Sequence, residues 1–335
     1  MELLRELSMA FGPSGNEEAV RNIIAKHIKP YVDEIKVDKY GNLIAHKKGN
    51  HLKVMLSSHM DEVGLMIKGI DSTGNISCSG VGGVDPLNFL GERVHIKTKK
   101  GYIYGVITTS QISNDEEPEN IPKMEDLIID TGLTKTELIK LGVEAGTYLN
   151  LDRYFLTLGN KDYVCGKALD DRTGCYILIE TAKKLKGCKA DIYYVFTVQE
   201  EVGLYGAKTS IYGISPDIAI IVDVTNADDM GLKSTKILGK GPCLTIKDSD
   251  MITNRKIDEL IKKVAKKSKI NLQLDVTDVG TTDALSVSIA KGGIPTTVLG
   301  VAVRNLHTTV GVAHMKDIND CVTLLYELLR KEPKF

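Results

Sequence analysis

Apolar residues recur at helical spacing in several parts of the chain. One such stripe runs from Asn254 to Lys267, and Asn254 is placed to cap the helix that it predicts. The same spacing predicts helices over Asn16 to His27, Arg172 to Leu185 and Lys316 to Arg330, and the first ten residues read as a short amphipathic helix. We expect surface helices that each bury one face.

Short runs rich in β-branched and aromatic residues alternate with these helices. They are KVMLSS (Lys53 to Ser58), DIYYVFTV (Asp191 to Val198), DIAIIV (Asp217 to Val222) and TTVL (Thr296 to Leu299). Strands interleaved with helices predict an α/β fold with a mixed central sheet that is covered by helices on both faces.

The pattern changes between residues 63 and 158. Many short strands and glycine-rich turns follow one another there, with a single brief helical stretch from Lys135 to Leu141. We therefore expect a small β-rich domain, residues 63–158, inserted into an α/β domain made of residues 1–62 and 159–335. Within the insert, the acidic run SNDEEPEN (Ser113 to Asn120) lacks apolar residues and predicts a mobile loop.

Composition and charge exclude several classes of function. The 335 residues include 43 Lys and Arg against 44 Asp and Glu, a net charge of -1, whereas binders of nucleic acid or of membrane surfaces need a basic excess. No apolar run approaches the ~20 residues of a membrane span, and the start does not resemble a signal peptide, so we expect a cytoplasmic protein. The six cysteines form no CxxC pair, which favours reduced, buried thiols.

Polar side chains follow three of the predicted strands. His59 and Asp61 come after the first, Glu200 and Glu201 after the second, and Asp223 after the third. Each alone could be a structural histidine or a solvated turn. In an open α/β sheet, however, ligands gather beyond the carboxyl ends of the strands. The coincidence of three such ends favours a metal site.

Two further segments add candidates to this site. Asp170 and Asp171 lie at the start of a predicted helix, where the alternative role is N-capping. His307, in the segment RNLHTT, follows the strand TTVLG, and His314 competes with it as the second histidine. The other histidines lie in polar contexts that favour surface roles.

The number and kind of these side chains suggest a reaction. Two histidines and several carboxylates suit two divalent ions about 3.5–4 Å apart that share one bridging carboxylate. One carboxylate is then left to carry a proton. This inventory fits hydrolysis by a water that paired ions acidify.

Taken together, the motifs resemble those of a known family. In order along the chain they are GPSGNE (12–17), DKYGNLIA (38–45), SSHMDEVG (57–64), GKALDDRTG (166–174), QEEVGLYGA (199–207), Asp223, GTTDA (280–284) and RNLHTT (304–309). Their order and content resemble the TET aminopeptidases, the dinuclear-metal glutamyl and deblocking aminopeptidase family. The resemblance covers essentially the whole chain.

The resemblance implies a role for each candidate residue. Glu200 matches the general acid/base, and Asp61 is similar to the carboxylate behind the first histidine ligand. Asp170 is preferred to Asp171 because the first aspartate of the pair aligns with the bridging residue in related sequences. The implied ligands are His59 and Asp223 for one ion, Glu201 and His307 for the other, and Asp170 between them. Zinc or cobalt is expected, and manganese is compatible with the same donors.

The implied activity is that of a metal-dependent aminopeptidase, which removes residues from the free N-termini of peptides. The family also implies that the insert mediates dimerisation and that the chain forms homo-oligomers, often tetrahedral dodecamers. Two alternatives are an endoglucanase-like glycosidase, since family members have carried that label, and a non-catalytic member of the fold. The chain departs from the family after Gly105, Val106 and Ile107, where a Pro-Pro-His-type segment is missing, but no proposed ligand is affected.

Overall fold

The chain folds into two compact units. The computed structural model describes residues 1–110, 121–187, 189–231 and 235–330. The larger unit comprises Met1–Asp61, Phe155–Leu306 and Val310–Phe335, and the smaller unit comprises Glu62–Tyr154 and His307–Thr309. The second boundary thus precedes Phe155, where we expected residue 159, because β10 (Leu156–Thr157) pairs with β11 (Tyr163–Gly166) of the larger unit. The predicted acidic loop, Ser113 to Asn120, lies outside the described residues.

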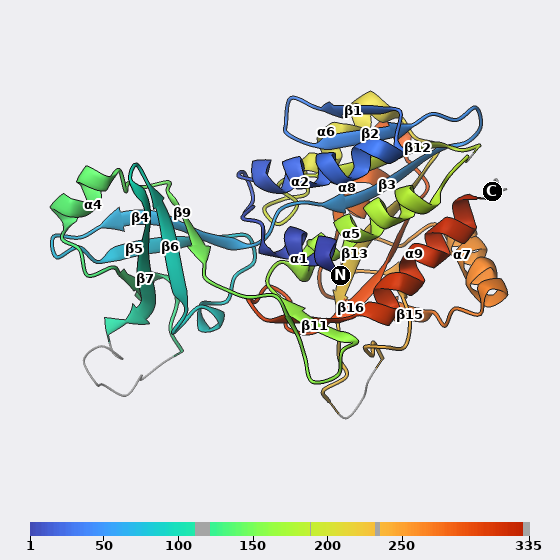
Figure 1. Cartoon of the computed structure of the whole chain (residues 1–335). Helices are drawn as coiled ribbons and strands as arrows, with labels where there is room; N and C mark the ends of the chain where they lie inside the picture. Colours follow the sequence, from blue (N-terminus) through green and yellow to red (C-terminus); the bar gives the residue numbers. More distant parts are fainter. Residues whose placement is uncertain (111–120, 188, 232–234, 331–335) are drawn as a thin grey trace. The chain divides into compact units, whose positions relative to one another are not determined.

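The larger unit is built on an eight-stranded mixed sheet (Figure 1). The four central strands run parallel, so their carboxyl ends share one edge, while β2 and β14 run antiparallel to their central neighbours. In spatial order the strands are β1 (Glu34–Val37), β2 (Leu43–Lys47), β12 (Asp191–Thr197), β3 (Lys53–His59), β13 (Ile218–Asn226), β16 (Thr296–Val303), β14 (Cys243–Lys247) and β15 (Gln273–Val276).

Alternate residues of the strands face two hydrophobic cores. On β3, Val54 and Leu56 join the core that also contains α1 (Glu2–Met9), α2 (Glu18–Ile28), α5 (Leu169–Lys184), α7 (Arg255–Ser268) and α9 (Met315–Leu329). Met55, between them, packs on the opposite face with α6 (Tyr205–Ile214) and α8 (Asp283–Ser288). Helices therefore cover both faces of the sheet, and the predicted fold class is confirmed.

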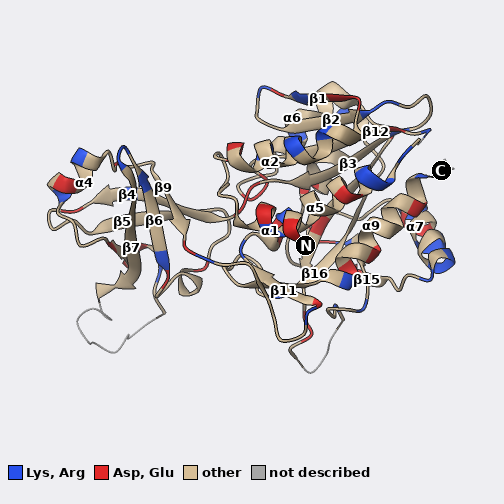
Figure 2. Cartoon of the chain, viewed as in Figure 1, with Lys and Arg blue, Asp and Glu red and all other residues tan. Residues whose placement is uncertain are grey.

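The local sequence of helix α7 determines where the helix begins and which face it buries. The Asn254 side chain accepts hydrogen bonds from the main-chain N–H groups of Lys256 and Ile257, which is the predicted N-cap. Ile257 and Ile261 are buried, whereas most basic residues of the helix are exposed. Figure 2 colours these basic residues of α7 blue. The predicted surface helix with one buried face is confirmed.

Two central strands are longer than predicted. We expected one to stop before Asp223 and another to stop at Leu299, but β13 and β16 pair residue by residue as far as Asn226 and Val303. The polar residues Thr225 and Asn226 suggested a strand end, yet the ladder with β16 holds them in the sheet. Asp223 therefore projects from within a strand and not from a loop.

The smaller unit is a closed antiparallel barrel with its own hydrophobic core. Its helix α4 (Lys135–Leu141) has the predicted bounds and begins with a capping box between Thr134 and Glu137. The barrel strands, in order around the barrel, are β4 (Gly64–Ile70), β5 (Ile76–Val81), β8 (Leu127–Asp130), β7 (Gly101–Thr109), β6 (Arg93–Thr98) and β9 (Tyr148–Leu151). The third sheet, β10, β11 and β17 (Gly311–His314), belongs to the larger unit.

Two expectations from composition can be compared with the structure. Of the described cysteines, Cys78, Cys175, Cys243 and Cys321 are buried thiols, and Cys165 is half-buried. None of the helices in the described ranges has the length and apolar character needed to cross a bilayer.

Arg172, in the first regular turn of α5, is fully buried and joins three segments of the chain. Its guanidinium donates to the main-chain oxygens of Met60 (2.7 Å), Leu7 (2.6 Å) and Gly12 (3.2 Å). We expect Arg172→Met to lower the free energy of unfolding by at least about 3 kcal/mol, because several buried carbonyl groups lose their charged donor.

Urea denaturation of this variant would measure the loss of stability. Lys184→Met, on an exposed position of the same helix, serves as the control and should change stability by no more than about 0.5 kcal/mol. Equal stability of the two variants would contradict a structural role for Arg172.

Candidate metal centre

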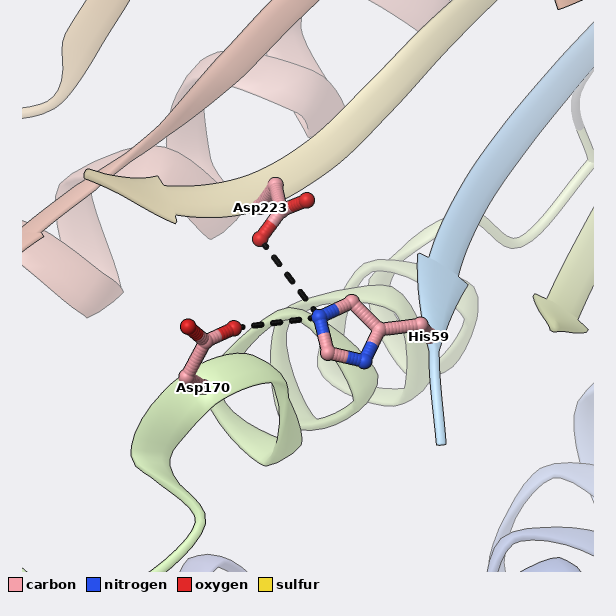
Figure 3. A group of neighbouring side chains, drawn as sticks. All are labelled: His59, Asp170 and Asp223. Atoms are coloured by element: carbon pink, nitrogen blue, oxygen red, sulfur yellow. Dashed lines mark hydrogen bonds and ion pairs between the residues drawn. The ribbon is translucent and has the colours of Figure 1, made fainter. Parts of the chain in front are cut away.

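Three potential metal ligands meet at the carboxyl edge of the central sheet (Figure 3). His59 ends β3, Asp170 precedes the regular part of α5, and Asp223 projects from β13. The Nε2 atom of His59 lies 3.0 Å from Asp170 Oδ1 and 3.8 Å from Asp223 Oδ1. One ligand atom from each residue lies within 4.8 Å of the others, which is close enough for one ion to contact all three.

Asp61 holds the Nδ1 side of the His59 ring. Its Nδ1 atom lies 3.1 Å from the main-chain oxygen of Asp61 and 3.5 Å from Asp61 Oδ1. The hydrogen bond therefore goes to the main chain of Asp61, with the carboxylate slightly further away. Because Nδ1–H is used in this way, Nε2 faces Asp170 and Asp223 and is the nitrogen that can bind a metal.

The two adjacent aspartates have different partners. Asp171 Oδ1 accepts from the main-chain N–H of Gly174 at 2.9 Å, and Oδ2 accepts from the Ser58 hydroxyl at 2.6 Å. Asp171 thus caps the regular helix, since both aspartates have non-helical backbone angles. Asp170 instead faces His59. Asp171 therefore takes the capping role weighed for this pair, and Asp170 is left as the candidate ligand.

The turn after β12 presents two more carboxylates. The main-chain N–H groups of Glu200 and Glu201 donate to Asp61 Oδ1 (3.0 Å) and Oδ2 (3.1 Å). Asp61, predicted to support His59, thus also holds this turn. A carboxylate oxygen of Glu201 lies within 4.8 Å of one of Asp170, and the Glu200 side chain is buried.

The site contains more buried carboxylates than positively charged groups, and this imbalance shifts the pKa values of its residues. Burial alone would lower the pKa of His59, but the charge of Glu200 and the nearby carboxylates of Asp170 and Asp61 outweigh it and raise that pKa well above the usual range. Burial raises the pKa of Asp223 to about 7.

Burial also raises the pKa of Glu200 well above its ordinary value, although the positive charge of His59 opposes the shift. A divalent cation would compensate the negative charge that the buried carboxylates carry when ionised. The combination of imidazole and carboxylate donors suits such an ion.

Asp283 is a buried acid near this site to which the sequence assigned no role. Its Oδ2 accepts a 2.6 Å hydrogen bond from the Thr197 hydroxyl at the end of β12, and burial raises its pKa to about 6. The motif GTTDA marked this residue, but neither a strand end nor a helical stripe pointed to it. Only the packing of α8 against the sheet brings it here.

The two candidate histidines of the C-terminal region belong to different units. His307 belongs to the short segment His307–Thr309 that groups with the barrel unit, so its role as a ligand stays a prediction. His314, the competing candidate, has a structural role. Its Nδ1 accepts from the main-chain N–H of Lys316 and caps α9.

The chain is similar to known proteins over nearly its whole length. The sequence profile of the family described as M42 glutamyl aminopeptidase matches residues 41–324. The chain is 39% identical to a protein of Acetivibrio thermocellus over 98% of each chain, and 34% identical to the lysyl aminopeptidase of Pyrococcus furiosus over 98% of this chain and 96% of the relative.

A solved structure is also similar over nearly the full length. The TET1 peptidase of Pyrococcus horikoshii, described as able to assemble into a tetrahedron or a large octahedral shell, superposes with a TM-score of 0.89 at 34% identity over 98% of each chain. The chain belongs to the M42 glutamyl aminopeptidase family, whose members are hydrolases of peptide bonds.

Proposed function

We propose that the chain is an aminopeptidase that depends on two divalent ions and uses Glu200 as its general acid/base. The observation that carries this proposal is the meeting of His59, Asp170 and Asp223 at the carboxyl edge of the sheet, with Glu200 buried nearby. In this proposal His59 and Asp223 would hold one ion, Glu201 and His307 would hold the other, and Asp170 would be a ligand of both. Zinc or cobalt, or manganese, suits these donors.

In this proposal Glu200 transfers the proton and Asp61 positions the residues of the site. Ions bound at such a site supply Lewis acidity and lower the pKa of water. Glu200 takes a proton from the attacking water and delivers it to the amine that leaves. Burial raises the pKa of this carboxyl well above its ordinary value, which helps it to hold the proton that it passes to the amine. Asp61 holds the main chain of Glu200 and orients His59.

We also propose that peptides are the substrates and that the chain works as a homo-oligomer. The peptide substrates follow from the family, and the oligomer from the assembly described for the Pyrococcus horikoshii relative. The barrel, a separate compact unit with its own core, supports a role for the insert in contacts between subunits.

A panel of chromogenic aminoacyl substrates tests the activity and reveals the preferred N-terminal residue. We expect the metal-loaded protein to release the chromophore from substrates with a free α-amine and not from the matching N-acetylated compounds. A soluble cellulose substrate, assayed in parallel, tests the glycosidase alternative. Equal cleavage of blocked and free substrates, or cellulose hydrolysis that survives chelation, would contradict the proposal.

A further inference from the structure

The turn that carries Glu200 and Glu201 is held through its main chain. Four consecutive N–H groups, from Val198 to Glu201, each donate to a side-chain oxygen of a residue from a distant segment. The acceptors are Asn42 Oδ1 for Val198 (3.1 Å), Glu17 Oε1 for Gln199 (3.3 Å), and Asp61 Oδ1 and Oδ2 for Glu200 (3.0 Å) and Glu201 (3.1 Å). Two of these acceptors lie in motifs that the proposed mechanism leaves unused, GPSGNE and DKYGNLIA.

Glu17 is buried and accepts hydrogen bonds from two main-chain N–H groups. Its side chain is buried, and the same Oε1 atom accepts a 2.6 Å bond from the N–H of Gly15. Ser14, in the same loop, donates to Asp61 Oδ2 at 2.6 Å. The loop before α2 therefore contacts both the turn itself and the carboxylate that holds the rest of the turn.

Asn42 forms hydrogen bonds with both ends of the same turn. Its Oδ1 accepts from Val198, and its Nδ2 donates to the main-chain oxygen of Gly206 at 2.9 Å, just inside α6. Asp38 in turn accepts from Asn42 Nδ2 at 2.6 Å. With its two ends fixed by Asn42, the direction in which Glu200 projects depends on the N–H groups between them.

The backbone conformation of Gln199 explains why its hydrogen bond to Glu17 matters. Gln199 has a φ of 55°, in the left-handed region that residues other than glycine rarely adopt. Such a conformation persists where the surroundings enforce it, and the bond from the Gln199 N–H to Glu17 is one of those restraints. Without that oxygen, the Gln199 N–H would lose this acceptor and the turn could relax.

Stability alone gives little reason for a carboxylate at position 17. Glu17 lies close enough to Asp61 for their charges to repel, and this repulsion adds to burial in raising the pKa of Glu17. We propose that Glu17 is a positioning residue, which acts through the Gln199 N–H to fix the turn from which Glu200 projects. This inference rests on the role proposed for Glu200.

Substitution of Glu17 tests the inference in the metal-loaded protein. We expect Glu17→Ala to lower kcat by about 10²-fold, the cost of a misplacement of about 1 Å, with KM and bound metal unchanged. Glu17→Gln should retain most activity because its amide oxygen can accept the same bonds. Glu18→Ala, on an exposed neighbour in α2, is the matched control. If Glu17→Ala does not fold, Glu17→Met preserves the volume without a carboxylate oxygen.

A double-mutant cycle separates positioning from a general structural role. If Glu17 acts through Glu200, replacement of Glu17 by Ala in a Glu200→Gln background should cause no further loss of kcat. An equal loss in both backgrounds, wild-type kcat in Glu17→Ala, or equal damage from Glu17→Gln and Glu17→Ala would each overturn the inference. Normal turnover of Glu200→Gln alone would instead refute the proposed function.

Discussion

Glu200→Gln should keep its bound metal and lose about 10²–10⁴-fold of kcat, the usual cost of removing a general acid or base. The amide preserves the volume of the side chain, and the hydrogen bond to Asp61 uses the main-chain N–H, so the turn should stay in place. What is lost is a carboxyl group that accepts and releases a proton. Steady-state kinetics on the best substrate of the panel, together with elemental analysis of bound metal, would measure both quantities.

Glu201→Gln provides the contrast to this experiment. Its carboxylate lies near Asp170 and is assigned to metal binding, so this variant should lose metal as well as activity. Glu18→Gln, on an exposed position, should behave as the wild type. If Glu200→Gln lost metal to the same extent as Glu201→Gln, Glu200 would act as a ligand and not as the proton carrier.

Much of the fold could be predicted because burial and hydrogen bonding leave local patterns. The stripe in α7 and its Asn254 cap are visible in the sequence, as are the apolar runs of the central strands. Ligand positions at strand ends could be anticipated for a related reason. Parallel strands bring their carboxyl ends to one edge, so His59 and the Glu200 turn converge whatever the intervening sequence.

Features that depend on partners distant in the sequence could not be predicted. β13 extends to Asn226 because β16 pairs with it, and nothing local to Thr225 and Asn226 reveals that partner. Local pattern left the roles of Asp170 and Asp171 open, and only the family resemblance favoured Asp170 as the ligand. The division depends on Ser58 and His59, which lie more than a hundred residues earlier. Glu17 is a similar case, because its partner Gln199 lies 182 residues further along the chain.

Removal of metal by a chelator should abolish peptidase activity and lower the midpoint of thermal unfolding, and both should return on addition of zinc, cobalt or manganese. An ion present at about 100 times its Kd stabilises the folded state by about 2.7 kcal/mol, since it binds the folded chain alone. The ion stabilises the folded chain because it compensates the charges of buried carboxylates, which water cannot reach. Activity assays and thermal scans with and without chelator would measure both effects.

The pH dependence and a ligand variant show whether this stabilisation comes from the proposed site. With the pKa of Asp223 raised to about 7, a proton occupies that carboxylate in the metal-free protein at lower pH and must leave when an ion binds. Apparent metal affinity should therefore increase as the pH rises through this range. In His59→Ala the added ion should no longer shift the unfolding midpoint to the same extent, because the ion then lacks its imidazole ligand. An undiminished shift in that variant would place the stabilising ion elsewhere in the protein.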